Sequence, residues 1–151
     1  DPNQKHEVRE LIREIAPEKA IIISTHILEE VDAICSRAVI IADGKVIADG
    51  APNELAQRSA IFNAVAVVLS KDVAERARAA LDPLDAVKEI RAMSQADGHA
   101  KLIVAPKDGA MILNTVAGAL ADANVDVVSV RPEASALEDL FRHLTLKGEA
   151  A

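Results

Sequence analysis

Aromatic residues are almost absent from this chain of 151 residues, which has two Phe and neither Trp nor Tyr. Proteins that read single-stranded nucleic acids commonly stack the bases on aromatic rings. An excess of basic charge is also missing, since the formal net charge is −7 and both halves of the chain are acidic. The sequence therefore indicates neither a base-reading surface nor a basic face for phosphate backbones or anionic lipid.

Cysteine and long hydrophobic runs are equally scarce. The single Cys35 excludes a disulfide within the chain and cannot build a cysteine-based zinc site, which fits a reducing compartment. No apolar run approaches the roughly 18 residues of a membrane helix, and no signal peptide is found. We therefore expect a cytoplasmic protein without direct membrane insertion. Hydrophobic residues make up 50% of the chain, which is ample for a packed core.

The first 59 residues show the layering of an α/β fold. Apolar residues at helical spacing predict a helix from Glu7 to Ala16 that Pro17 ends. The apolar run at 20–25 predicts a short buried strand of the kind found in parallel sheets. A second helix should follow His26, with Glu29, Glu30 and Asp32 on its solvated face.

The dipeptide Asp43-Gly44 then predicts a tight hairpin, because it supplies the positive φ angles of the turn. Residues 50–55 turn the chain into a short helix. A polar stretch at 57–59 predicts a linker, so we place a first domain at 1–59 and a second at 60–151.

The second domain has the predicted element order βαββαβ and a further helix at its end. This order is typical of a ferredoxin-like split βαβ sandwich, an α+β fold of four strands and two helices. We expect Asp72 with Glu75, and Ser135 with Glu138, to cap two of its helices. The predicted strands and helices lie at 61–70, 72–81, 87–94, 99–106, 110–123, 125–132 and 136–145.

The four histidines do not form a metal site in the sequence. His6, His26, His99 and His143 lack ligand spacing, and His99 and His143 are interpreted as surface residues. No phosphate-binding glycine loop, nucleophile elbow or Ser/His/Asp arrangement is present. Only His26 has a functional interpretation, because it follows a predicted buried strand, at the edge where open α/β sheets bind ligands.

The stretch IIISTHILEEVDAICSRAVIIADGKVIADGAPNEL closely resembles the carboxyl-terminal part of the ATP-binding subunit of ABC transporters. Ser24-Thr25-His26 matches the family's switch motif, and Asp1 matches the aspartate of its D-loop. Arg37, Asp43-Gly44 and 50–55 match its closing pattern, with Ser36 in place of the usual aspartate. A final phrase at 136–145 looks like the end of accessory domains appended to exporters of this family.

The resemblance implies a partial ABC nucleotide-binding fold in which His26 contacts the γ-phosphate of ATP and Asp1 lies at the interface with a second ATPase subunit. It implies a parent protein that uses ATP and Mg²⁺, works as a homodimer and joins the cytoplasmic face of the membrane through permease subunits. Walker A, the Q-loop, the signature motif and Walker B are absent from these 151 residues, and the first residues, DPNQ, look like the middle of a longer chain. We therefore expect a carboxyl-terminal fragment that neither binds nor hydrolyses ATP by itself.

Two alternatives remain open. Residues 60–151 could form a regulatory module that binds a small molecule or mediates dimerisation, since βαββαβ sandwiches often pair their sheet edges. An independent enzyme with His26 as general base is the third possibility, but no orienting carboxylate stands at a recognisable spacing.

Overall fold

The helix predicted near the beginning of the chain is present, although it starts earlier than the pattern indicated. In the computed structural model, which describes residues 2–148, α1 spans Pro2–Ile15 and a 3₁₀ turn, η1, follows at Ala16–Glu18. Val8 and Leu11 on this helix are more than half exposed. No residue of α1 belongs to any of the three buried apolar clusters found among the described residues.

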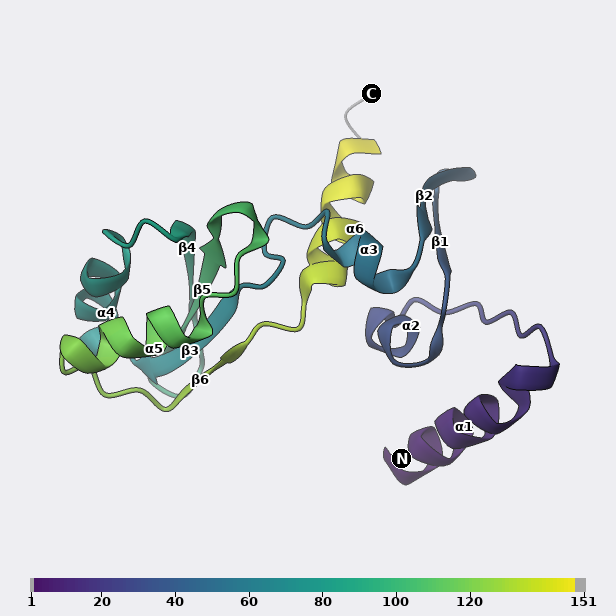
Figure 1. Cartoon of the computed structure of the whole chain (residues 1–151), viewed down its shortest axis with the longest axis horizontal. Coiled ribbons are helices and arrows are strands. Elements are labelled where there is room, and N and C mark those ends of the chain that lie inside the picture. The colour runs from purple at the N-terminus through teal and green to yellow at the C-terminus, as the bar shows by residue number, and fades with distance from the viewer. Residues whose placement is uncertain (1, 149–151) are drawn as a thin grey trace.

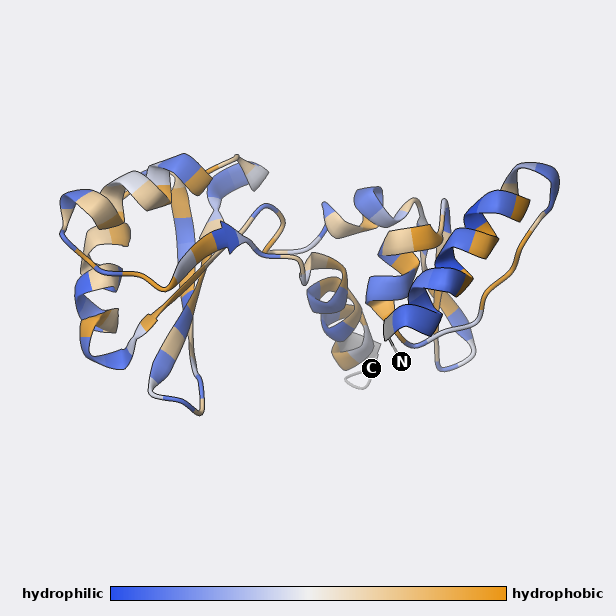
Figure 2. Cartoon of the chain, turned by 90° about the horizontal axis from the view of Figure 1, so that it is seen from below, coloured by the Kyte–Doolittle hydropathy of each residue, from blue (hydrophilic) through white to orange (hydrophobic). Residues whose placement is uncertain are grey.

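The strand predicted at 20–25 is wrong. Residues 19–27 form an extended connection without sheet pairing, and Ile22 is 97% exposed. Figure 2 shows this hydrophobic stretch as an orange trace at the right of the picture. A strand is stabilised by the backbone of a neighbour, and no neighbour pairs with this segment anywhere in residues 2–148. The parallel sheet that it implied is likewise absent from that range, where every paired strand is antiparallel.

The helix and hairpin predicted after His26 are confirmed. Helix α2 spans Leu28–Ile34, and strands β1 (Ala38–Ala42) and β2 (Lys45–Gly50) pair in antiparallel fashion. Asp43 and Gly44 form the turn with φ angles of 50° and 71°, as the dipeptide predicted. The short helix α3 follows at Pro52–Ala56.

The middle of the chain folds into a second antiparallel sheet with the predicted element order. Its strand order is β4-β5-β3-β6, and α4 and α5 cover one face of it (Figure 1). Val67, Leu69 and Leu102 from the strands and Leu81 and Val116 from the helices are buried between these layers. The elements are β3 (Val65–Ser70), η2 (Lys71–Val73), α4 (Ala74–Leu81), β4 (Val87–Ser94), β5 (His99–Pro106), η3 (Lys107–Gly109), α5 (Leu113–Asp122) and β6 (Ser129–Pro132). The fold is thus mixed α/β with two antiparallel sheets.

The last helix, α6 (Ala136–Gly148), leaves this sheet and packs against the first hairpin (Figure 1). Leu137 and Leu140 are buried there in one cluster with Ile40, Ala48 and Leu55. Two lobes result, the first made of α1 to α3, the hairpin and α6, and the second made of the four-stranded sheet with α4 and α5. The division of the chain between residues 59 and 60 stays a prediction.

The two predicted helix caps are wrong, because nearer partners occupy the capping residues. The carboxylate of Asp72 accepts a hydrogen bond from the hydroxyl of Ser70, and no side chain caps α4. The backbone N–H and the hydroxyl of Ser135 both donate to Glu133, at 3.2 and 2.8 Å, and not to Glu138.

Among residues 2–148 no helix is both long and apolar enough to cross a membrane.

Candidate functional site

His26 lies on the exposed connection that leads into α2. It sits at a bend two residues before the first turn of the helix, and its side chain is exposed. The Thr25 hydroxyl oxygen accepts a hydrogen bond of 3.0 Å from the backbone N–H of Ile27, which fixes the backbone on both sides of the histidine. Within the described part of the chain the imidazole has no hydrogen-bond or ion-pair partner, so both ring nitrogens are open to a ligand.

The acidic residues of α2 differ in their surroundings. Both Glu29 and Glu30 pair with Arg9 of α1, but the Glu29 side chain is exposed, as expected for a solvated helix face, whereas the Glu30 side chain is 22% exposed. Its Oε1 lies 3.4 Å from the guanidinium of Arg9 and 3.6 Å from the ammonium of Lys5. The interpretation of Glu30 as a solvated residue is therefore wrong, and ion pairs hold α1 against the helix that follows His26.

Asp1, the residue matched to the D-loop, lies outside the described residues. Arg37, which matches the family's closing pattern, forms a bidentate ion pair with Asp49 at 2.8 and 2.7 Å. This contact lowers the pKa of the Asp49 carboxyl through the hydrogen bonds from Arg37. The Asp43-Gly44 turn sets the hairpin register and brings these two residues together. Arg37 has a structural role here, tying the beginning of the hairpin to its end.

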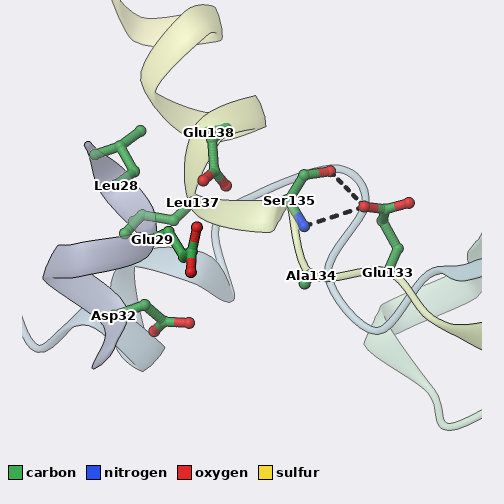
Figure 3. Close-up of a pocket in the computed structure, with 8 residues that line it drawn as sticks. All are labelled: Leu28, Glu29, Asp32, Glu133, Ala134, Ser135, Leu137 and Glu138. Atoms are coloured by element: carbon green, nitrogen blue, oxygen red, sulfur yellow. Dashed lines mark hydrogen bonds between the residues drawn. The ribbon is translucent and has the colours of Figure 1, made fainter. Parts of the chain in front are cut away.

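A hollow of about 290 Å³ lies between α2 and the beginning of α6, and it is acidic (Figure 3). Glu29 and Asp32 from α2 line it together with Glu133 and Glu138, and one carboxylate oxygen of Glu138 is buried without a partner. Carboxylates repel phosphate, so this hollow does not fit the phosphates of a nucleotide. Its lining does not include His26. The described residues also contain no group of three or more His, Cys, Asp or Glu arranged to hold a metal ion.

The remaining histidines lie in unrelated places. His6 and His143 are exposed on α1 and α6. His99 Nδ1 lies 3.0 Å from the Asp97 carboxylate at the β4–β5 turn, and its hydrogen bond lowers the pKa of Asp97. No hydrogen bond or ion pair joins any of them to His26 in the part of the chain that the structure describes, and His26 remains the candidate contact for a nucleotide.

The chain resembles parts of known ATP-binding proteins over about a third of its length. It is 41% identical over 56 residues to the Nod factor export ATP-binding protein I of Burkholderia orbicola, covering 36% of this chain and 18% of that protein. The Rhizobium leguminosarum bv. viciae protein of the same name is 38% identical over 56 residues, with the same shares covered. ABC transporter A family member 11 of Dictyostelium discoideum is 40% identical over 55 residues, 36% of this chain and 7% of that protein.

The matched stretch is thus less than a fifth of the length of these relatives. No protein-family model matches the chain. The identity over these residues nevertheless agrees with the resemblance seen in the motifs, and all three relatives bear the names of ABC transporter or export ATP-binding proteins. One region of this chain is related to the ATP-binding proteins of ABC transporters.

Proposed function

We propose that residues 1–59 act as the carboxyl-terminal portion of the ATPase domain in the ATP-binding subunit of an ABC transporter of the exporter type, and that residues 60–151 are its accessory domain. The parent protein couples ATP binding and hydrolysis to export, and permease subunits hold it at the cytoplasmic face of the membrane. The observation that carries this proposal is Ser24-Thr25-His26 directly before α2, with an exposed imidazole. The similarity to export ATP-binding proteins supports it.

In this function His26 donates a hydrogen bond to a γ-phosphate oxygen of ATP. An imidazole suits this contact because one nitrogen can donate to the phosphate while the other meets a second subunit, where Asp1 belongs to the interface. ATP with Mg²⁺ supplies the phosphoryl group that leaves during hydrolysis. Among the described residues, His26 can make one contact with a phosphate. A phosphate-binding loop that carries a lysine is not present among them.

The first test is titration of this chain with Mg-ATP. We expect no saturable binding at micromolar concentrations, because a single histidine contact cannot substitute for the interactions that hold the phosphates and the metal in a complete nucleotide site. Saturable micromolar binding would show that other residues of this chain hold the nucleotide. A competition with ADP would then show whether the γ-phosphate contributes to that binding.

The second test places His26→Ala in the complete ATP-binding subunit. Because His26 contacts the phosphate that departs, we expect kcat to fall far more than the affinity for ATP. His143→Ala, a change of the same kind at an exposed position on α6, is the matched control and should leave both quantities unchanged. An affinity loss without a loss of kcat would contradict the role assigned to His26.

A second function, dimerisation, is favoured by the four-stranded sheet. We propose that this lobe is ferredoxin-like, since its strand order and its two helices on one face agree with that arrangement. Both β4 and β6 are edge strands, which can pair with a second copy. Light scattering at micromolar concentration should show a homodimer, whereas a stable 16.0 kDa monomer would contradict it.

The dimer can be tested at the edge strand itself. Met93→Lys places a charge on the exposed outer part of β4 and should produce monomers, because edge charges block strand pairing. Met111 is 84% exposed and lies outside the sheet, so Met111→Lys is the matched control. If the dimer persists in the Met93→Lys variant, the contact between the two copies does not involve this part of β4.

A further inference from the structure

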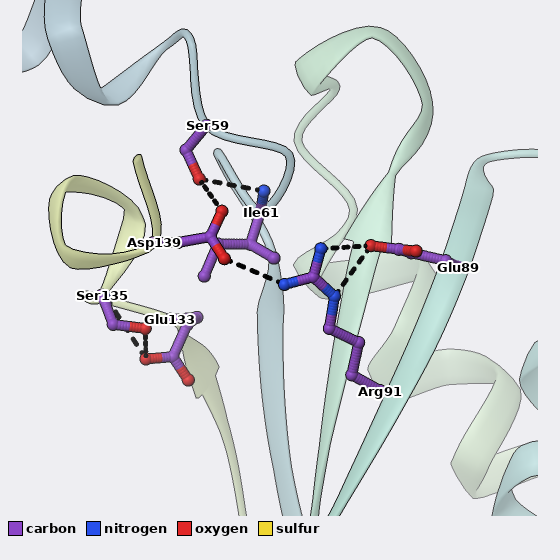
Figure 4. A network of polar contacts seen from close by, with 7 residues as sticks. All are labelled: Ser59, Ile61, Glu89, Arg91, Glu133, Ser135 and Asp139. Atoms are coloured by element: carbon purple, nitrogen blue, oxygen red, sulfur yellow. Dashed lines mark hydrogen bonds and ion pairs between the residues drawn. The ribbon is translucent and has the colours of Figure 1, made fainter. Parts of the chain in front are cut away.

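The two lobes are joined by a polar network that reaches across three distant segments of the chain (Figure 4). Arg91 lies on β4 in the sheet, Asp139 lies on α6, and Ser59 lies in the segment that leads from α3 to β3. The Arg91 guanidinium donates to Asp139 Oδ1 at 2.9 Å, and the Ser59 hydroxyl donates to Asp139 Oδ2 at 2.8 Å. One carboxylate therefore binds both the sheet and the connecting segment.

Both charged groups are held in position by further contacts. The Nε and Nη2 atoms of Arg91 lie 2.9 and 2.7 Å from Glu89 Oε1, which directs the remaining Nη1 towards α6. The Ser59 oxygen accepts a hydrogen bond of 3.1 Å from the backbone N–H of Ile61, and Ser59 is buried. The network therefore has a fixed geometry, unlike an isolated pair of flexible side chains on the surface.

Apolar contact between the lobes is comparatively small. The cluster at the junction contains Ile61 and Ile103, and its other buried members are alanines. Helix α6, by contrast, is fixed to the first lobe by buried leucines. Since the chain crosses between the lobes only near 57–64 and 132–136, the junction has the form of a hinge that a few polar contacts can close.

We propose that the Arg91–Asp139–Ser59 network is a latch that fixes the orientation of the four-stranded lobe relative to α6 and the first lobe. With the latch closed, the two lobes move as one body. The Arg91 side chain is 41% exposed and that of Asp139 is 20% exposed, so salt or a competing charged group can reach them. Opening the latch frees the sheet lobe to turn about the two crossings while the apolar cores of both lobes remain intact.

The latch can be tested by measuring the distance between spin labels on the two lobes. In a Cys35→Ser background, Lys45→Cys in the hairpin and Asp85→Cys before β4 provide two exposed labelling positions, one on each lobe. We expect one narrow distance distribution for this protein. Adding Arg91→Met or Asp139→Asn should replace the narrow peak by a broad one, and 1 M NaCl should broaden the distribution in the otherwise unchanged protein.

The matched control is Arg37→Met, which breaks an arginine–aspartate pair of 2.7 Å within the first lobe. It should leave the distance distribution narrow. Thermal unfolding of each variant separates opening of the latch from loss of the fold, since neither Arg91 nor Asp139 belongs to an apolar cluster. The proposal is overturned if Arg91→Met leaves the distribution narrow, or if Arg37→Met broadens it equally.

Discussion

Lys101 and Glu133 form an ion pair at the place where the sheet lobe ends and the chain turns towards α6. The Lys101 ammonium lies 2.6 Å from Glu133 Oε2, and the Glu133 side chain is only 7% exposed. The other oxygen of this carboxylate accepts hydrogen bonds from the backbone and hydroxyl of Ser135. Glu133 lies 32 residues after Lys101 in the chain. The ion pair therefore joins β5 to the segment before α6.

Removing only the ammonium should leave this carboxylate buried and without its counter-charge. We expect Lys101→Met to lower the free energy of unfolding by about 2–3 kcal/mol, because an unpaired buried charge is costly. The double variant Lys101→Met with Glu133→Met should recover most of this loss, since it removes both charges. Urea unfolding measures each value. A double variant that is less stable than either single one would contradict this account.

Stability should also fall in acid because of Glu133. Burial raises the pKa of this carboxyl, but the hydrogen bonds from Lys101 and Ser135 outweigh burial and hold the pKa below its ordinary value. The unfolded chain therefore binds this proton more readily than the folded one, so the stabilisation is complete above the ordinary pKa of about 4 and is lost as the pH falls further.

The carboxyls of Asp49, Asp72 and Asp97 also have lowered pKa values and add to the same trend. Melting temperatures measured from pH 5 downwards should therefore decrease in the unchanged protein. Glu133→Gln has no carboxyl at this position, so its melting temperature should decrease less steeply over the same range. Equal slopes for the two proteins would show that Glu133 does not contribute.

Local features of the fold could be predicted where neighbouring residues determine them. Asp43-Gly44 predicted the hairpin because its φ angles are properties of the two residues themselves. Helical spacing likewise predicted a helix within 110–123, and α5 buries Val116 and Leu120 on one side, since periodicity reflects burial on one side.

Features that depend on distant parts of the chain could not be predicted. The run at 20–25 has the composition of a buried strand, but a strand also needs a neighbour that composition does not reveal. The contact between Arg91 and Asp139 joins residues 48 positions apart, and no local pattern marks it. The helix after His26 was predicted from the apolar spacing that follows the histidine and is confirmed. The sheet edge expected at His26 is absent from residues 2–148, and the contact of His26 with ATP stays a prediction.

Two glycines should respond in opposite ways to the same substitution. Gly109 has a φ angle of 67°, and an added Cβ would lie 3.1 Å from Cδ1 of Phe62. We expect Gly109→Ala to lower the free energy of unfolding by about 1–2 kcal/mol, because the left-handed conformation disfavours a side chain. Gly118 in α5 has open space around it, so Gly118→Ala should raise stability by about 0.5–1 kcal/mol. Chemical denaturation of both variants checks the signs.

Leu69 and Ile22 are large aliphatic residues in opposite environments, and their replacement by alanine tests which of the chain's apolar surfaces hold the fold together. Leu69 on β3 is completely buried between the sheet and its helices, whereas Ile22 is 97% exposed. We expect Leu69→Ala to cost about 3 kcal/mol, since it removes buried methyl groups and leaves a cavity. Ile22→Ala should change stability by less than about 0.5 kcal/mol, because it removes no contact within the chain. Urea unfolding at low protein concentration provides both values. A large loss for Ile22→Ala would show that residues 20–25 are covered in solution, by another copy or by another part of the protein.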